Sequence, residues 1–145
     1  MSRDLKPLLA FDFGLKRIGV ATANRLTRTA TPLVTLESGA APPWDAIAGL
    51  IAAWQPGLIV VGHPGAGADA KLLTALEDFV AELERRSALT VERVDESLTS
   101  YQAEAELRAG RAEGVYNRRL GRGRIDSFAA CLIAEQWMHE TLERD

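Results

Sequence analysis

The sequence contains little cysteine and little histidine. Its one cysteine, Cys131, cannot form an internal disulfide, which fits a reducing compartment, and it lies in an apolar helical segment as a small core residue. The two histidines, His63 and His139, are isolated and show no zinc-ligand spacing with that cysteine. No serine has an evident histidine partner for a catalytic triad. Zinc and serine-nucleophile chemistry are therefore not expected.

Long apolar runs and nucleotide-binding motifs are also missing. No run approaches the roughly 20 residues that span a bilayer, and the first residues lack the apolar stretch of a secretory signal. We therefore expect a cytoplasmic protein with no membrane contact. There is no Walker A motif, and Gly65-Ala66-Gly67 is too short for a dinucleotide fingerprint. Aromatic residues make up 6% of the chain, and no platform for stacking bases stands out.

What remains is the composition of an ordinary globular domain. The chain has 145 residues, of which 47% are hydrophobic and 26% are charged. This length suits one domain over residues 1–145 and leaves little room for two. A monomer and a homodimer are both compatible with the sequence.

Positive charge is concentrated in one segment, although the net charge of the chain is −3. Residues 108–124 contain six arginines and a single acid, so this segment carries +5 and the rest of the chain −8. Arginine suits planar, bidentate contact with phosphate. Four glycines in the same stretch predict a basic loop rather than a charged helix face. We expect this loop to close on a phosphate backbone, and a solvated charged surface is the alternative.

Hydrophobic periodicity predicts five strands in a mixed sheet. The runs are Leu8–Phe13, Arg17–Ala23, Thr31–Leu36, Leu58–Gly62 and Thr90–Val94. Short turns join the first three, which predicts an antiparallel meander with Pro32 at the start or edge of its strand. The last two are reached through helices, which predicts that they are parallel and buried.

Four helices are expected between and after these strands. The first has apolar residues at helical spacing from Trp44 to Ala52, and Asp69 caps the second. A capping box of Thr99 and Gln102 starts the third, which runs to about Arg108. The last helix carries an apolar stripe from Ile125 to Trp137. Strands and helices together predict an α/β domain.

Acidic residues occur where an apolar strand or its end is expected. Asp12 interrupts an apolar strand, and a buried carboxylate needs a cation or several donors. The alternative is an acid at the strand end that meets solvent, Lys16 or Arg17. Asp95 and Glu96 follow a buried strand, at the end where open α/β sheets bind ligands. Only one of this pair can share a site with Asp12, because adjacent strand residues face opposite ways. Both could instead be loop acids.

Asp126 lies between the arginine segment and the last apolar stripe, where by itself it is typical of a helix N-cap. The three acidic positions can converge at one edge of the sheet. Converging carboxylates repel one another unless a hard cation, Mg²⁺ or Mn²⁺, lies between them. Such a site clamps the attacking and leaving oxygens of an in-line phosphoryl displacement. Beside a basic loop, it favours a nuclease.

Five segments of the chain together resemble the motif pattern of a known protein family. They are Phe11–Ala21, Thr31–Leu33, Val60-Val61-Gly62 with Pro64, Asp95–Thr99 and Gly123–Ala130. In order and spacing they resemble the YqgF family of proposed pre-16S rRNA nucleases, also described as Holliday-junction-resolvase-like. The similarity extends from about Leu8 to Trp137, and its first and last segments are the most specific.

The resemblance implies a ribonuclease-H-like fold, with a mixed five-stranded sheet flanked by helices. It implies a catalytic and metal-binding trio of Asp12, Glu96 and Asp126 with Mg²⁺ or Mn²⁺ as cofactor, and it is the only ground for preferring Glu96 to Asp95. It also implies a bacterial cytoplasmic protein that matures the 5′ end of 16S rRNA. The chain departs from the family pattern in the loop His63–Asp69 and at Ser97, which replaces an arginine. These departures affect substrate contacts rather than the carboxylates, and His63 either faces the substrate or ends its strand.

The leading hypothesis is a metal-dependent endonuclease that acts on RNA. The candidate nucleic-acid-binding residues are Lys16, Arg17, Arg118, Arg119, Arg122 and Arg124. Cleavage of branched DNA junctions is an alternative that the sequence does not separate, because phosphate contacts are common to both. A non-catalytic nucleic-acid-binding factor is a second class. An actin-like ATPase ranks last, because 145 residues do not provide its second lobe.

Overall fold

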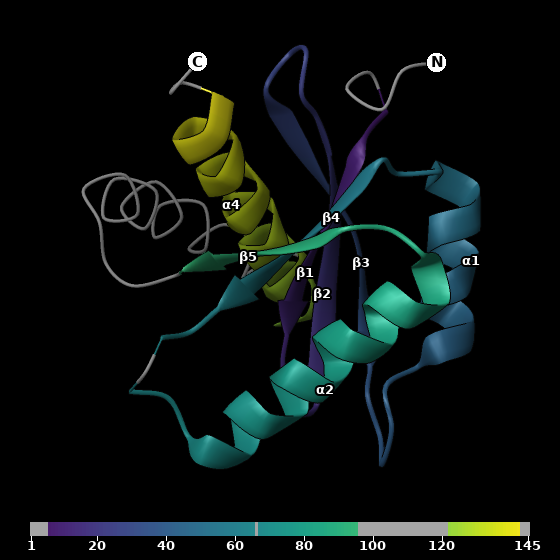
Figure 1. Cartoon of the computed structure of the whole chain (residues 1–145), viewed down its shortest axis with the longest axis vertical. Coiled ribbons are helices and arrows are strands. Elements are labelled where there is room, and N and C mark those ends of the chain that lie inside the picture. Colours follow the sequence, from purple (N-terminus) through teal and green to yellow (C-terminus); the bar gives the residue numbers. More distant parts are fainter. Residues whose placement is uncertain (1–5, 66, 96–121, 143–145) are drawn as a thin grey trace.

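A five-stranded sheet forms the centre of the fold (Figure 1). The structure, a computed structural model, describes residues 6–65, 67–95 and 122–142, and only the backbone of residues 122–125. The strands are β1 (Leu8–Phe13), β2 (Arg17–Asn24), β3 (Thr29–Glu37), β4 (Leu58–His63) and β5 (Val91–Asp95). Their spatial order is β3-β2-β1-β4-β5.

The pairing of the strands follows the expected pattern. β1 pairs antiparallel with β2, and β2 with β3, so the predicted meander is confirmed. β4 is parallel to both β1 and β5. It is buried along nearly its whole length, because helices cover both faces of the sheet at this position. Pro32 lies in the edge strand β3 beside a register shift, where its missing N–H is tolerated.

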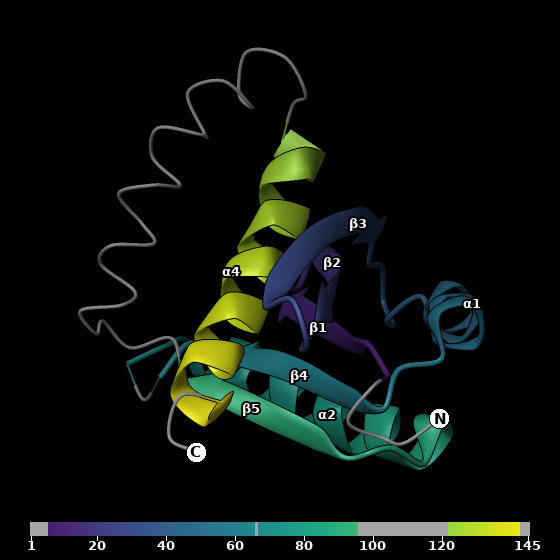
Figure 2. The ribbon, with the colours of Figure 1, turned by 90° about the horizontal axis from the view of Figure 1, so that it is seen from above.

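Three helices cover the two faces of the sheet in the described part of the chain. They are α1 (Trp44–Trp54), α2 (Ala70–Ser87) and α4 (Arg122–Leu142). α1 and α2 lie on one face and α4 crosses the other (Figure 2). Asp69 caps α2 as predicted, since its carboxylate accepts a 2.7 Å hydrogen bond from the N–H of Lys71. None of these helices is long and apolar enough to cross a membrane.

The start of α4 corrects two expectations. The basic loop was expected to reach Arg124, with Asp126 as a possible N-cap, but α4 already begins at Arg122. Arginine is a good helix former, and one glycine costs only about 1 kcal/mol relative to alanine, so Gly123 does not stop the helix. Asp126 therefore lies one turn inside α4. Residues 96–121, with the predicted third helix, lie outside the described residues.

The two faces of the sheet hold separate parts of the core. Large side chains fill the α1 and α2 face, among them Leu9, Phe11 and Phe79, each of which is fully buried. The α4 face is built around Leu8, Ala10, Val60 and the inward side of α4.

The inward side of α4 differs in part from the predicted apolar stripe. Ala130, Cys131, Ala134 and Met138 are buried there, whereas Phe128 is only half-buried. The expectation that Cys131 is a small core residue is confirmed.

Candidate active site at the ends of β1 and α4

Asp12 is placed by the alternation of side chains along β1. Phe11 packs toward α1 and α2, whereas Leu8 and Ala10 pack toward α4. Since successive residues of a strand point to opposite faces, Asp12 lies on the α4 face, next to the end of β1. It is half-buried there. The sequence-based expectation of an acid inside an apolar strand is met.

Gly19 allows α4 to lie directly on the sheet beside Asp12. It is the cross-strand neighbour of Asp12 in β2. A Cβ atom added to it would lie 2.0 Å from the carbonyl oxygen of Asp126, closer than any real contact. The absence of a side chain at this position therefore brings the backbone of α4 against β2. Sequence reasoning did not assign this role, although a glycine inside a strand often marks close backbone approach.

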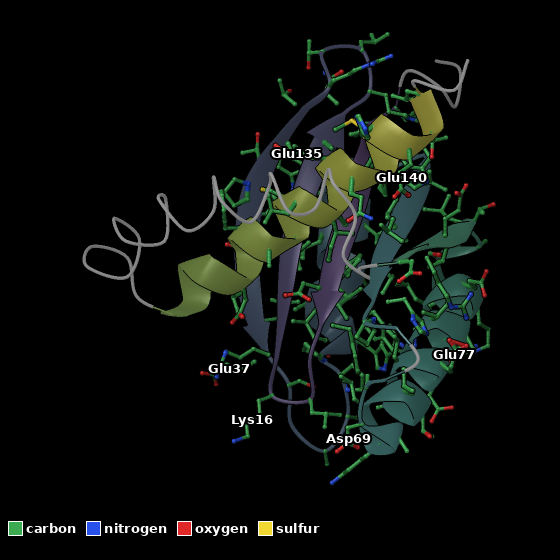
Figure 3. The ribbon with its side chains drawn as sticks, turned by 90° about the vertical axis from the view of Figure 1, so that its left-hand side faces the viewer. Lys16, Glu37, Asp69, Glu77, Glu135 and Glu140 are labelled. Atoms are coloured by element: carbon green, nitrogen blue, oxygen red, sulfur yellow. The ribbon has the colours of Figure 1, made fainter. Side chains whose placement is uncertain are left out.

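Asp12 and Asp126 line the same hollow, which we call the acid hollow. Its other lining residues are Phe13, Gly14, Leu15, Lys16, Arg17 and Leu72, and its volume is about 380 Å³. Lys16 lies at the same end of the molecule as Asp69, far from Glu140 near the other end of α4 (Figure 3). Asp126 thus meets Asp12, Lys16 and Arg17, which lie more than 100 residues before it in the sequence, at one place.

Arg17 forms an ion pair inside the acid hollow. Its Nε donates a 2.9 Å hydrogen bond to Oδ2 of Asp126, and the two side chains are 36% and 25% exposed. A partly exposed pair of this kind contributes at most about 1 kcal/mol to folding. Asp12 lines the same hollow as Lys16 and Arg17, so the alternative of an ion pair between Asp12 and one of these cations stays open. The pair of Arg17 and Asp126 places a positive charge beside two carboxylates.

The alternation along β5 separates Asp95 from Asp12. Glu92 accepts a 2.9 Å bond from Nε1 of Trp137 on α4, so even-numbered positions face α4. Arg93 bonds Glu77 of α2 at 2.8 and 3.0 Å, so odd-numbered positions face α2. Asp95 belongs to this second set and lies on the opposite face of the sheet from Asp12.

Gln136 of α4 fixes the end of β5. It is buried, and its Nε2 donates to the backbone carbonyl of Asp95 at 2.8 Å and to Oε1 of Glu140 at 3.0 Å. Both protons of the amide are therefore used. Glu96 lies outside the described residues. The carbonyl group that accepts from Gln136 is that of Asp95, which forms the peptide bond to Glu96. No sequence signal singles Gln136 out, because a glutamine within a helix is ordinarily a surface residue.

The remaining predicted residues lie at or beyond the limits of the described structure. Arg122 and Arg124 are in the first turn of α4, and only their backbone is described. Arg118 and Arg119 lie outside the described residues.

His63 ends β4, which favours the structural interpretation of this residue. Its Nδ1 accepts a 3.1 Å bond from the N–H of Gly65, which adopts a positive φ of 97°. The imidazole thus holds the turn that follows β4.

The donor set of the acid hollow fits a hard divalent cation. Asp12 and Asp126 supply carboxylate oxygens, the ligands that Mg²⁺ and Mn²⁺ prefer. Within residues 6–65, 67–95 and 122–142 there is no cluster of three or more metal-ligating side chains. The third predicted carboxylate, Glu96, falls in the undescribed segment.

Comparison with known proteins decides the family. The family model for RuvX, described as a Holliday junction resolvase, matches residues 6–140. The chain belongs to the RuvX family. A protein of Legionella pneumophila (strain Paris), named for a proposed nuclease activity on pre-16S rRNA, is 41% identical over 136 residues, 92% of this chain and 95% of its own length. A Marinobacter nauticus protein of the same name is also 41% identical, over 92% of both chains. The resemblance seen in the sequence is confirmed.

Solved structures agree on the fold. RuvC of Thermus thermophilus, in a complex with a Holliday junction substrate, aligns with a TM-score of 0.64, 14% identity and coverage of 95% of both chains. The Fowlpox virus resolvase in its Holliday junction complex aligns with a TM-score of 0.51 at 13% identity, over 94% of this chain and 99% of its own. At this identity the likeness shows the fold alone, and it confirms the expected ribonuclease-H-like architecture. Family and fold together support a nuclease.

Proposed function

We propose that this protein is a divalent-metal-dependent endonuclease that hydrolyses phosphodiester bonds during maturation of the 5′ end of 16S rRNA. One observation carries the proposal: two carboxylates from distant parts of the chain, Asp12 and Asp126, line one hollow together with Lys16 and Arg17. The names of the curated relatives support the RNA substrate. Such an enzyme acts in the cytoplasm, on nucleic acid.

Asp12, Asp126 and Glu96 would hold the cation. Asp95 lies on the α2 face, opposite to Asp12, which leaves Glu96 as the candidate ligand of this pair. When bound, Mg²⁺ or Mn²⁺ supplies Lewis-acid activation of the phosphate and stabilises the charge that develops on its oxygens. The protein residues bring the carboxylates together, and the close packing at Gly19 holds Asp126 in place.

The cations of the hollow would hold the substrate backbone. Lys16 is exposed at its rim. Arg17 is bound to Asp126, and its guanidinium can turn from that carboxylate to a phosphate that enters the hollow. Arg118, Arg119, Arg122 and Arg124 belong to the strongly basic segment and would extend the contact along the polyanion.

Substitution of Asp12 by Asn tests the proposal. The substrate is a 16S precursor leader RNA with Mg²⁺ or Mn²⁺, and Asp45→Asn on the exposed side of α1 is the matched control. We expect the Asp12 variant to lose cleavage by about 100-fold or more, because one metal ligand is removed, while RNA binding stays equal or tightens. The control should cut like the wild type. Equal cutting by all three proteins would refute the role of Asp12 in the site. RNA binding by all three, with no cutting of this RNA or of a DNA junction, would refute the nuclease proposal and leave a binding factor.

Cleavage of branched DNA is the second candidate function. Its support is the description of the matching family and the coverage of nearly the whole chain by RuvC. A four-way DNA junction run in parallel with the leader RNA separates the two. Metal-dependent cutting of the junction alone, lost in the Asp12 variant, would assign a resolvase.

A further inference from the structure

A second hollow lies beside the acid hollow, and we call it the aromatic hollow. It has a volume of about 340 Å³ and lies between the end of β1, the segment from β3 to α1, and α2. Phe13, Trp44 and Phe79 form its wall, and small residues such as Ala41 complete it. This volume is large enough for a planar ring of nucleobase size, and nothing in the proposed chemistry uses it.

The two hollows are adjacent. Phe13 and Leu15 line both of them. Asp12 and Phe13 are neighbours on β1 and face opposite sides of the sheet, so the hollows meet around the end of this strand. Leu15, which is 42% exposed, lies at the junction as a large apolar side chain in contact with water. A ligand whose charged part enters the acid hollow can therefore place an apolar part in the aromatic hollow.

The wall is a row of three rings. Phe79 is fully buried between the other two, with its centroid 4.7 Å from that of Phe13 and 5.4 Å from that of Trp44. Trp44 is nearly parallel to Phe79, at an interplanar angle of 20°. Phe13 and Trp44 are half-buried and line the hollow, and the guanidinium of Arg86 lies over the Trp44 ring, 4.7 Å from its centre. Aromatic surfaces of this kind bind bases, at about 1–3 kcal/mol for each stacked base.

Charge separates the two hollows. Among the residues that the structure describes, no lysine or arginine lines the aromatic hollow, and the charged lining residues are Asp78 and Glu82. Hydrogen bonds from Arg85 and Arg86 lower the pKa of Glu82 to about 2, so this carboxylate is ionised at neutral pH. Glu82 is held in ion pairs with Arg85 and Arg86, so Asp78 is the lining carboxylate that would accept a hydrogen bond from an amino group on a ring. The acid hollow, by contrast, contains Lys16 and Arg17.

We propose that the aromatic hollow binds one unpaired nucleobase with an exocyclic amino group, from the same nucleic acid whose backbone lies in the acid hollow. This inference rests on the proposed function. It adds a specificity site to it, because the enzyme would prefer an unpaired adenine, cytosine or guanine beside the bond that it cuts. Uracil and thymine carry no exocyclic amino group and would bind more weakly.

The matched probes are RNA oligonucleotides of cytosine only and of uracil only, equal in length. The two bases have the same size and differ at their pairing edge, where cytosine has an amino group and an acceptor nitrogen and uracil has a carbonyl oxygen and an N–H. Ala41→Phe fills the aromatic hollow from an exposed position, and Ala46→Phe on the outer side of α1 is the control. Affinity is measured in EDTA, so that no strand is cut. We expect the wild type and the control to bind the cytosine strand about tenfold more tightly, and Ala41→Phe to bind both strands with the affinity for uracil.

Two results would overturn the inference. One is equal affinity of the wild type for the two strands, which would leave an apolar peptide side chain as the better occupant. The other is a cytosine preference that survives in Ala41→Phe. Cleavage of the leader RNA with Mg²⁺, measured on the same proteins, keeps this test separate from the proposed function. Cleavage that depends on Asp12, without a base preference, overturns the base site alone, and a preference without any cleavage overturns the nuclease alone.

Discussion

The two faces of the sheet are packed against their helices in different ways. On the α1 and α2 face, large side chains such as Phe11, Ile18 and Phe79 fill the space between sheet and helices. On the α4 face, the residues of β1 and β2 include Ala10, Gly19 and Ala21, which bring the backbone of the helix close to the strands. The first arrangement buries apolar area and supplies stability. The second sets the position of the helix that carries Asp126, which we propose as a metal ligand.

Directional bonds strengthen this difference. Side-chain hydrogen bonds join α4 to the sheet. Arg17 donates to Asp126, Trp137 donates to Glu92, and Gln136 donates to the backbone carbonyl of Asp95. Apolar packing tolerates small shifts, whereas hydrogen bonds weaken steeply when their geometry changes. Catalytic groups must be held to within about half an ångström, and packing alone rarely does so. The α4 face therefore combines close backbone contact at Gly19, beside Asp12, with these hydrogen bonds, which we call the polar ties of α4.

Substitution of Gly19 by Ala should disturb the packing of the α4 face, with the largest effect on stability and cleavage among these predictions. The new Cβ would collide with the carbonyl oxygen of Asp126, so α4 must move away from β2. We expect a loss of about 1–3 kcal/mol in the free energy of unfolding, as for other overpacked sites. Cleavage should fall by about 100-fold, because a displacement of about 1 Å at a reacting group has that effect.

The control for this variant is Gly49→Ala in the middle of α1. A Cβ there meets nothing within 4 Å, and removing a helical glycine should stabilise the protein by about 0.5–1 kcal/mol with no change in activity. Urea unfolding and cleavage of the leader RNA check both variants. A Gly19→Ala protein that unfolds and cuts like the wild type would show that α4 is not held by close contact.

Much of this arrangement could be predicted from the sequence, because it depends on patterns among residues that are close together in the chain. The apolar runs of β1 and β4 predict strands, because such a pattern depends only on residues that are close in the sequence. Asp12 stood out because an acid inside an apolar strand needs an explanation, whereas Asp126 by itself was typical of a helix N-cap and gained interest only together with the other acids. The row of Phe13, Trp44 and Phe79 could not be predicted, since these residues come from three separate elements and meet only in the folded chain. The role of Gly19 depends in the same way on where α4 crosses the sheet.

Substitution of Gln136 by Met should have a smaller effect on stability than Gly19→Ala, and it tests what the polar ties of α4 contribute. The volume is similar, but the carbonyl of Asp95 loses its side-chain donor, at a cost of about 1 kcal/mol. If the end of β5 positions a metal ligand, the Mg²⁺ concentration for half-maximal cleavage should rise about tenfold, as for other supporting residues of metal sites. Glu140→Gln keeps an acceptor for Gln136 and is the control. An unchanged Mg²⁺ requirement in a destabilised Gln136→Met protein would assign Gln136 a structural role only.

The titration of the Cys131 thiol tests whether water is excluded from the middle of the α4 face. Its expected effect on the free energy of unfolding is the smallest among these predictions. Burial, with Glu135 nearby, raises the pKa of its thiol from 9.0 to about 12. Between these values the unfolded chain loses the proton while the folded chain keeps it, so the free energy of unfolding should fall as the pH rises above 9, by about 1 kcal/mol per pH unit. Urea unfolding at pH 8 and pH 10 should show this loss in the wild type and less of it in Cys131→Ala. A thiol that reacts with iodoacetamide at pH 8 as fast in the folded protein as in urea would mean that water reaches the interface between α4 and β2. The close contact at Gly19 would then be local, and the polar ties alone would hold the helix.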